Sequence, residues 1–403
     1  MSNDAAKLGF NPQRLQRIDD WMHRCIDIGR YTGSSVLIAR QGEIAHLSCV
    51  GLSSREKNIA YARDTIVRIK SMSKMITTVG FMMLLERGLI HLDAPLSAVL
   101  PGFDKCHALI DGAERADQVE PVDCPTLHHL LTHTSGMTYG FNPGVLGQHY
   151  EAIGLDFGPK SGGTEAVCKR VAEVPLAFRP GTSWEYSIGI DVLGRVIEVL
   201  DGRPLDQYLK EEIFDPLGMV DTGFDVPADR VHRFADCYGK TEEDALAPID
   251  PADSSIYLAS GPRTFSGGGG LVSTLDDYFK FGEMVRQYGR LPDGSDLLSP
   301  QIFKFMRRNH LKGEISSMGP SSFAEMPMDG MGFGLGGAVV LDPARCRMPG
   351  SVGDFGWGGL ASTYFWTDPV HQLTVIYFTQ LIPSSAYPNR AELKALVQAA
   401  LKD

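Results

Sequence analysis

The chain has 403 residues, of which 43% are hydrophobic and 22% are charged, and its formal net charge is −11. This length predicts a large core with more than one layer or domain, and the acidic balance excludes a nucleic-acid partner, which would need a basic face. No apolar run approaches the roughly 18 residues of a membrane span. The start of the chain lacks a basic region followed by an apolar stretch, so we expect no secretory signal.

Seven cysteines are scattered along the chain and never stand in C-x-x-C spacing. This pattern is typical of a reduced cytoplasmic protein with buried thiols rather than of a disulfide framework.

The first elements predict a helix followed by a hairpin. Asn11 and Pro12 resemble an N-cap and the first helical position of a helix that ends near Gly29. Residues 34–40 and 43–49 are strand-like runs around Gln41-Gly42, which is typical of a hairpin. A further β-favouring run then leads to Ser71, so we expect an antiparallel sheet with helices packed on it.

The middle of the chain, from about Leu89 to Gly223, predicts mostly helices and loops. Apolar periodicity and turn residues place the helices at 126–131, 165–174, 188–200 and 208–214.

Strand patterns return in the last third. We expect one strand over 332–340 and a hairpin of 359–367 with 373–381, and helices over 275–288 and 390–401. The prediction is an α/β (α+β) protein, in which 1–75 and 225–403 form the sheet domain and 76–224 form an inserted helical domain.

Ser71 and Lys74 form an S-x-x-K motif where a β-favouring run meets a strongly apolar helix. In the first helical turn, free backbone N–H groups and the helix dipole favour negative charge. A serine hydroxyl needs a base, and an amine without water around it gives up its own proton more readily. The motif therefore predicts a nucleophile, a base and half of an oxyanion site.

A second S-x-x-K occurs at Ser54 and Lys57. It lies in a charged stretch after Gly51 without a predicted strand before it or an apolar helix after it, so we interpret it as a solvated loop. Its context favours Ser71 as the functional copy.

Tyr186 follows a Pro-Gly turn and precedes a helix, where a loop can project it into a cleft. A nearby ammonium favours phenolate, so a tyrosine beside Lys74 can shuttle protons. The alternative for Tyr186 is a half-buried tyrosine that covers an apolar seam. The stretch 356–360 (GWGGL) enters a strand, and an N–H at Leu360 can complete an oxyanion hole with that of Ser71. Its alternative is a β-bulge or a turn.

In this order, the three elements resemble the serine β-lactamase and penicillin-binding-protein family. The chain is most similar to its carboxylesterase branch, the family VIII esterases, which share the class C β-lactamase fold. The likeness extends to 130–136 (LLTHTSG), 216–219 (PLGM) and 332–336 (GFGLG) and covers nearly the whole chain.

Two departures from the β-lactamases concern substrate recognition. The resemblance places an asparagine where this chain has Ile188, and a Lys-Thr-Gly triplet where it has Trp357-Gly358-Gly359. Loss of the amide and of the cation removes charge-assisted recognition of a lactam drug, and apolar surface suits a neutral ester. We expect Trp184, Tyr139 and Phe141 to line the acyl pocket as well.

The resemblance thus implies a serine carboxylesterase that acts on small, neutral, short-to-medium acyl esters. Ser71 is the expected nucleophile, Lys74 and Tyr186 the proton-transfer groups, and the N–H groups of Ser71 and Leu360 the oxyanion hole. No cofactor and no metal are expected. Three alternatives stay open: a β-lactamase or D-alanyl carboxypeptidase, an acyltransferase, and a silent binding protein.

Other motifs are weaker. No G-x-S-x-G nucleophile elbow occurs. His129 and His133 have the spacing of a zinc helix, but Leu130 stands where the glutamate of H-E-x-x-H belongs, so these histidines are expected to cap or pack a helix. Gly267–Gly270 lacks the Lys-Ser/Thr of a phosphate loop and predicts a tight backbone passage.

Overall fold

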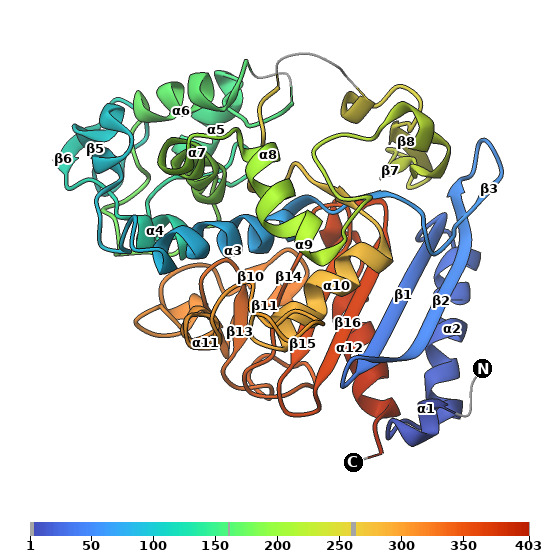
Figure 1. Cartoon of the computed structure of the whole chain (residues 1–403). Helices are drawn as coiled ribbons and strands as arrows, with labels where there is room; N and C mark the ends of the chain where they lie inside the picture. The colour runs from blue at the N-terminus through green and yellow to red at the C-terminus, as the bar shows by residue number, and fades with distance from the viewer. Residues whose placement is uncertain (1–3, 160–161, 259–262, 403) are drawn as a thin grey trace.

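A computed structural model describes residues 4–159, 162–258 and 263–402 (Figure 1). Its main element is an antiparallel sheet in which C-terminal strands pair with N-terminal ones. In spatial order the strands are β12 (Met331–Phe333), β13 (Ala338–Val340), β14 (Phe355–Gly358), β15 (Tyr364–Asp368), β16 (Leu373–Thr379), β1 (Gly33–Arg40), β2 (Glu43–Ser54) and β3 (Ile59–Ala60). The predicted sheet built from both ends of the chain is confirmed.

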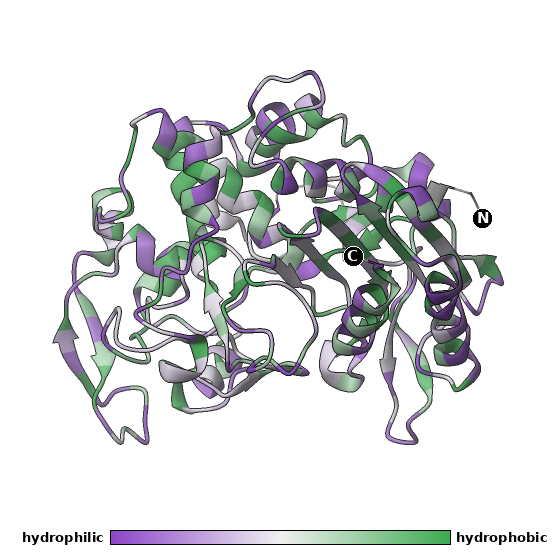
Figure 2. Cartoon of the chain, turned by 90° about the horizontal axis from the view of Figure 1, so that it is seen from below, coloured by the Kyte–Doolittle hydropathy of each residue, from purple (hydrophilic) through white to green (hydrophobic). Residues whose placement is uncertain are grey.

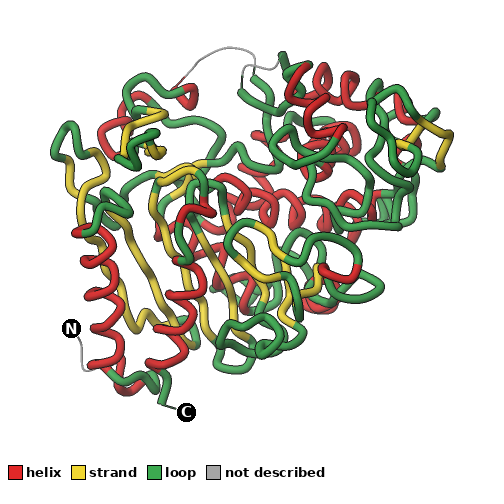
Figure 3. Tube along the Cα trace, turned by 180° about the vertical axis from the view of Figure 1, so that it is seen from behind, coloured by secondary structure: helices red, strands yellow, loops and turns green. Residues whose placement is uncertain are grey.

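The two faces of this sheet bury alternate residues of each strand, as the two-residue period of a strand requires. Val36 and Ile38 of β1 pack with the terminal helices α2 (Pro12–Asp27) and α12 (Asn389–Ala400). Leu37 and Ala39 face the opposite side, in a cluster that includes α10 (Leu275–Arg286). Figure 3 shows α2 and α12 together on one face of the sheet.

The terminal helices follow their sequence signals. The side chain of Asn11 accepts hydrogen bonds from the backbone N–H groups of Gln13 and Arg14, which caps α2 as predicted. The indole of Trp21 donates to the carboxylate of Glu392 at 2.8 Å, so α2 and α12 are joined by a polar contact as well as by packing.

The helical part lies beside the sheet and is joined to it through α3 (Figure 1). Its helices are α3 (Ser73–Glu86), α4 (Leu127–Leu131), α5 (Val145–Ala152), α6 (Thr164–Ala172), α7 (Gly189–Asp201), α8 (Leu205–Leu209) and α9 (Asp215–Leu217). Helix α3 packs against α7 and α8, and the hydroxyl of Tyr208 donates to the carbonyl of Gly80 at 2.8 Å. The predicted domain boundaries at 75 and 225 stay a prediction.

Several short elements complete the chain. They are α1 (Asp4–Lys7), α11 (Pro300–Met306), β4 (Val67–Arg68) paired with β9 (Val272–Ser273), β5 (Cys106–Leu109) with β6 (Val119–Val122), β10 (Ser322–Phe323) with β11 (Met326–Pro327), and β7 (Cys237–Lys240) between β8 (Leu246–Asp250) and β17 (Leu381–Ile382). The hairpin β5–β6 lies in the region expected to contain helices and loops.

Three sequence predictions need correction. Residues 332–340 form two strands, because the chain turns at 334–337, where Gly336 has a φ of +79°. Residues 359–363 form a turn before β15 rather than the start of a strand, and Ser362 has a φ of +63°. Ser54 is not in a loop, because it is the last residue of β2 and is buried.

Hydrophobic residues occupy the strands and the inward faces of the helices, and hydrophilic residues follow the outer surfaces (Figure 2). Over the three described stretches, no helix combines the length and the apolar character needed to cross a membrane.

Candidate active site

Ser71 lies in a tight turn between β4 and α3 and is partly exposed. The preceding residue, Lys70, has a φ of +48°, which costs a non-glycine residue about 1–3 kcal/mol and persists only where neighbours enforce it. Here the hydroxyl of Ser73 donates to the Lys70 carbonyl at 2.6 Å, and Tyr278 donates to the Met72 carbonyl at 3.1 Å. The turn is therefore held from two sides, and it presents Ser71 at the start of α3.

Lys74 lies one helical turn below Ser71, and only 1% of it is exposed. Its Nζ lies 3.4 Å from Ser71 Oγ, 2.8 Å from the hydroxyl of Tyr139 and 2.6 Å from the carbonyl oxygen of Gly268. It also lies 4.6 Å from the ring centroid of Tyr186. The structure thus brings together the predicted pair and Tyr186, with Tyr139 as a direct partner of the lysine.

Asp191, in the first turn of α7, forms the next layer and is almost fully buried. Its carboxylate accepts hydrogen bonds from the hydroxyl of Tyr139 at 3.0 Å, from the N–H of Gly268 at 3.0 Å and from the hydroxyl of Ser266. Burial and the Asp191 charge raise the pKa of Tyr139 well above its ordinary value. Tyr139 therefore keeps its proton and directs it to Asp191.

Gly268 belongs to the stretch Gly267–Gly270, which the sequence predicts to be a tight backbone passage. This passage packs on α3, where the hydroxyl of Thr77 donates to the carbonyl of Gly267 at 2.8 Å. A Cβ on Gly268 would collide with the carboxylate of Asp191. The glycine thus allows the backbone of one residue to contact Lys74 through its carbonyl and Asp191 through its N–H.

Tyr186 is held by aromatic rings from both parts of the molecule. Its hydroxyl accepts a hydrogen bond from the indole N–H of Trp357 in β14 at 3.2 Å. Its ring lies 4.7 Å from the rings of His133 and Phe323, measured between centroids. Because an indole N–H only donates, the Tyr186 proton is not used in the contact with Trp357.

His133 supports the loop that carries Tyr186. Its Nδ1 accepts the backbone N–H of Ser187 at 3.2 Å, and its Nε2 is buried without a hydrogen-bond partner among the described residues. Burial, and then the charge of Lys74, lower its pKa well below the ordinary value, so the ring is neutral. His129 accepts the N–H of Thr126 and closes a capping box on α4. The two histidines pack and cap, as predicted.

The turn after β14 is fastened next to Ser71. The hydroxyl of Thr363 donates to the carbonyl of Ile69 at 3.2 Å, and a Cβ on Gly359 would collide with that same carbonyl. Gly358 likewise leaves room for the guanidinium of Arg390. The N–H groups of Ser71 and Leu360 donate no backbone hydrogen bond to any described residue. Two free N–H groups on adjoining segments are what an oxyanion site requires.

The remaining predicted pocket residues separate into two groups. Trp184 and Ile188 are buried, so they support the site rather than offer surface. Phe141 is 61% exposed and stacks on Tyr139, with ring centroids 4.8 Å apart. Trp357 stacks on Phe323 at 5.9 Å and forms an aromatic wall beside Tyr186. Because Trp357 is itself only 4% exposed, the apolar surface that a substrate can contact comes mainly from Phe141 and from the partly exposed Phe323.

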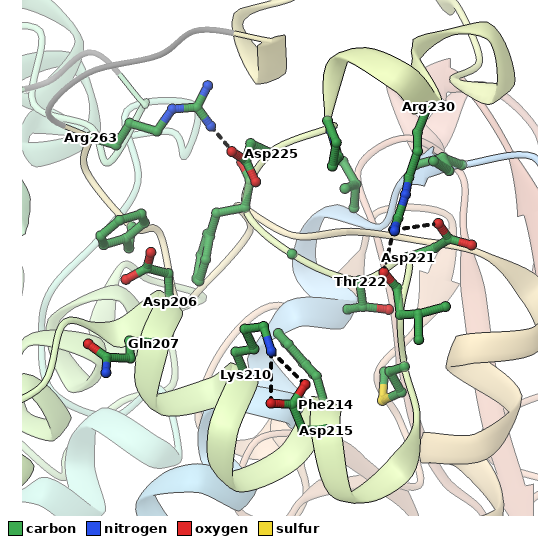
Figure 4. Close-up of a pocket in the computed structure, with 18 residues that line it drawn as sticks. Asp206, Gln207, Lys210, Phe214, Asp215, Asp221, Thr222, Asp225, Arg230 and Arg263 are labelled. Atoms are coloured by element: carbon green, nitrogen blue, oxygen red, sulfur yellow. Dashed lines mark hydrogen bonds and ion pairs between the residues drawn. The ribbon is translucent and has the colours of Figure 1, made fainter.

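A large cavity of about 670 Å³ lies elsewhere, between α8, α9 and the loop that follows them (Figure 4). Several of its charged side chains pair with each other, as Lys210 does with Asp215 at 2.7 Å and Arg230 with Asp221 at 2.9 Å. Ser71, Lys74 and Tyr186 are not among the described residues that line it. Chemistry rather than cavity size identifies the candidate active site.

Sequence reasoning missed Asp191, Gly268 and the contact of Tyr139 with Lys74. Asp191 had a signal, because it is a carboxylate on the buried face of an amphipathic helix, between Ile190 and Val192. Gly268 and Tyr139 had no such local signal in the sequence, because their contacts join segments that are far apart in the chain.

Comparison with known proteins agrees with this geometry. A family model named Beta-lactamase matches residues 18–399. Esterase EstB of Burkholderia gladioli is 31% identical over 394 residues, which cover 94% of this chain and 92% of that protein. Monacolin J acid methylbutanoyltransferase of Aspergillus terreus is 31% identical over 334 residues, 79% of this chain and 78% of that one. The solved structure of EstCE1, a hydrolase with promiscuous acyltransferase activity, matches the whole of both chains with a TM-score of 0.80 and 29% identity.

Proposed function

This chain belongs to the Beta-lactamase family of serine hydrolases, and we propose that within it the protein is a carboxylesterase that forms an acyl-enzyme on Ser71. The contact set around Lys74 carries the proposal. The lysine lies within reach of Ser71 Oγ and is surrounded by groups that fix the direction of each of its hydrogen bonds.

The hydrogen bonds of Lys74 support its role as the base. The Gly268 carbonyl can only accept, and the oxygen of Tyr139 also accepts from Lys74 because its one proton goes to Asp191. An uncharged amine has two protons and one lone pair. With both protons given to these acceptors, the lone pair is left for the hydroxyl of Ser71.

The catalytic sequence follows from these directions. Lys74 takes the proton of Ser71 as Oγ attacks the ester carbonyl, and the N–H groups of Ser71 and Leu360 bind the oxyanion. Tyr186, whose proton is not committed to Trp357, donates it to the leaving alcohol and is reprotonated from Lys74. Water then attacks the acyl-enzyme with the same groups in reverse order. Asp191 acts through Tyr139 and is a positioning residue.

The substrate proposal is a neutral ester with a short-to-medium acyl chain. Trp357 and Ile188 replace the cation and the amide that the family's lactam hydrolases use, and the exposed Phe141 and the partly exposed Phe323 supply apolar contact. Burial of apolar ester surface is worth about 25 cal/mol per Å².

The test compares hydrolysis of p-nitrophenyl butyrate and of a chromogenic cephalosporin by wild type and Ser71→Ala. We expect fast ester turnover, weak lactam turnover and loss of both in the variant. Dominant lactam turnover would favour the β-lactamase alternative, ester turnover at the wild-type level in Ser71→Ala would exclude Ser71 as the nucleophile, and no turnover of either would favour a specialised acyl donor or a binding protein.

Acyl transfer to an alcohol is the second candidate function. It is supported by the names of two relatives and by the exposed ring of Phe141, which offers a surface to a bulky acceptor. Addition of an apolar alcohol to the ester assay separates the two. A transferase gives more ester product than acid, whereas a hydrolase gives mainly acid.

A further inference from the structure

A buried arginine lies behind the turn that carries the Leu360 N–H group. Arg390 is in the first turn of α12, and only 5% of its side chain is exposed. A charged side chain is rarely buried without a specific partner, and the helix dipole opposes a cation at the start of a helix. The stability of α12 therefore does not explain Arg390, and its contacts indicate another role.

The guanidinium of Arg390 binds the peptide unit that joins Gly359 to Leu360. Its Nη2 donates to the carbonyl of Gly359 at 3.1 Å, and this contact is buried. The same carbonyl accepts the backbone N–H of Ser362 at 3.1 Å, which closes the turn. Two donors, one of them a cation, therefore fix the direction of this carbonyl.

The Gly359 carbonyl and the Leu360 N–H belong to one planar, trans peptide unit, so they point in opposite directions. A donor that holds the carbonyl therefore directs the N–H away from the guanidinium. This N–H donates to no backbone carbonyl among the described residues, and Leu360 is 38% exposed, so a substrate can reach it. A hydrogen bond from a cation also polarises the peptide unit, which strengthens its N–H as a donor.

Two neighbours confine the guanidinium to this place. A Cβ on Gly358, the last residue of β14, would lie 2.4 Å from Arg390 Cζ, so the glycine leaves the space that the guanidinium occupies. Glu325, between β10 and β11, forms an ion pair with Arg390 in which Oε1 and Nε are 3.1 Å apart. Arg390 thus joins the turn after β14 to the β10–β11 hairpin, which carries Phe323 of the aromatic wall.

We propose that Arg390 is a positioning residue of the oxyanion hole, which holds and polarises the Gly359–Leu360 peptide unit so that the Leu360 N–H donates to the oxyanion. This inference rests on the proposed acyl-enzyme on Ser71. Arg390 acts through the peptide unit rather than on the bound ester, so its loss should weaken binding of the transition state and leave binding of the substrate almost unchanged.

Lys394 is a matched control, because it is a second buried cation on the same helix. It pairs with Asp354, which precedes β14, whereas Arg390 binds the turn that follows β14. The two cations therefore hold opposite ends of one strand. A purely structural role would give Arg390→Met and Lys394→Met the same effect on activity.

The test measures kcat and KM for p-nitrophenyl butyrate, and Ki for butaneboronic acid. The boron bonds to Ser71 Oγ as the serine proton passes to Lys74, and a boron hydroxyl takes the place of the oxyanion. For Arg390→Met we expect kcat to fall by about 10–100-fold with KM within about twofold of wild type, and Ki to rise by the factor that kcat loses. Arg390→Lys keeps a cationic donor and should recover part of kcat. Lys394→Met should keep all three wild-type values.

Gly358→Ala tests the same contact without a change of the arginine. Its Cβ should displace the guanidinium and lower kcat by about tenfold. The double variant Gly358→Ala/Arg390→Ala should be no less active than Arg390→Ala, because the group that collides with the Cβ is absent. Circular dichroism identifies the folded variants.

Three results would overturn the proposal: wild-type kcat in folded Arg390→Met or in Gly358→Ala, a change confined to KM, or equal losses of kcat in Arg390→Met and Lys394→Met. Additive losses in the double variant would do the same, because Gly358 would then act independently of Arg390. A wild-type protein that neither hydrolyses the ester nor binds the boronic acid would instead contradict the proposed function on which this inference rests.

Discussion

The same motif occurs twice in this chain, and the two copies differ in what surrounds the lysine. The side chain of Lys57 is 41% exposed and pairs with Asp253 at 2.8 Å, which raises its pKa and holds it charged. Lys74 is 1% exposed, and its contacts are a carbonyl, a phenol and the hydroxyl of Ser71. The motif itself is therefore uninformative, and the packing around the lysine decides whether it can accept a proton.

The serines of the two motifs, Ser54 and Ser71, also differ in their surroundings. Ser54 ends β2, and its Oγ accepts the backbone N–H of Lys57 at 3.3 Å, which makes it a turn cap. Ser71 is in a strained turn at the start of α3, with its N–H group free of backbone partners in the described chain. The Ser54 hydroxyl thus binds a backbone N–H group, whereas Ser71 keeps a free N–H group of the kind that an oxyanion site requires.

The largest expected effect comes from the serines. Ser71→Ala should lower kcat/KM for p-nitrophenyl butyrate by about 10⁴-fold or more, because the nucleophile is removed. Ser54→Ala should leave kcat/KM within about twofold of wild type, at a cost of about 1 kcal/mol in unfolding free energy for the lost turn contact. Steady-state kinetics and chemical denaturation measure both. Equal loss of activity in the two variants would remove the distinction between the copies.

The lysines should give the next largest difference. Lys74→Met keeps the length of the side chain and removes the base, so we expect kcat to fall by about 10²–10⁴-fold. Lys57→Met should not change kcat, because the Lys57 side chain forms a surface ion pair with Asp253 that is worth up to about 1 kcal/mol. Circular dichroism should confirm that both variants are folded. A folded Lys74→Met with wild-type kcat would contradict the assignment.

A smaller effect tests the layer beneath Lys74. Asp191→Asn removes the negative charge and leaves one acceptor oxygen for the three donors Tyr139, Ser266 and Gly268, so the direction of the Tyr139 proton is no longer fixed and we expect kcat to fall by about 10–100-fold with little change in KM. Tyr139→Phe should have a similar effect. The kcat of the double variant should be no lower than that of the less active single variant, because both residues act on the same proton. Asp201→Asn on the same helix is the control, because its carboxylate pairs with Arg203 at the surface. A change confined to KM would show that Asp191 does not act on the chemical step.

Trp357 should contribute less. Trp357→Phe keeps the aromatic wall but removes the N–H that binds the hydroxyl of Tyr186, so kcat should fall by about tenfold. Trp366→Phe is the matched control, because Trp366 is equally buried and its indole N–H has no partner among the described residues. If both variants lose activity equally, the loss is one of packing and not of the hydrogen bond.

The smallest effect concerns stability against acid at the edge of α4. Burial, then the charges of His310 and His129, lower the pKa of His128 to about 4. The unfolded chain therefore binds more protons than the folded one, and stability falls as the pH drops from about 6.5 to about 4. His128→Gln should reduce this loss of unfolding free energy by about 1–2 kcal/mol, a value that we lower from the full linkage effect because His128 is partly exposed. Chemical denaturation of wild type and of His128→Gln between pH 4 and pH 7 measures the difference.

Local patterns in the sequence predicted elements whose stability is largely local or strongly amphipathic. Helix α2 has its cap and its apolar stripe, and the β1–β2 hairpin has its Gln41-Gly42 turn. The hairpin β5–β6 was not predicted, because its strands have four residues each and Pro121 interrupts the β pattern. Short strands depend on their pairing partners, which single-sequence reasoning does not identify.

The same limit applies to the site. Ser71, Lys74 and Tyr186 stand in local motifs, and the structure places them around one amine. Asp191 and Gly268 contribute through contacts that join α7 and the 267–270 passage to α3, and spacing in the sequence does not predict such contacts. Motifs therefore identified the residues that we propose to react, but not those that fix the directions of their hydrogen bonds.

Covalent trapping tests the central claim most directly. The protein is incubated with a p-nitrophenyl alkylphosphonate, which phosphonylates an activated serine, and its intact mass is measured for wild type, Ser71→Ala and Ser54→Ala. We expect one phosphonyl group on wild type and on Ser54→Ala, and none on Ser71→Ala. A stoichiometric adduct on Ser71→Ala would show that Ser71 is not the nucleophile.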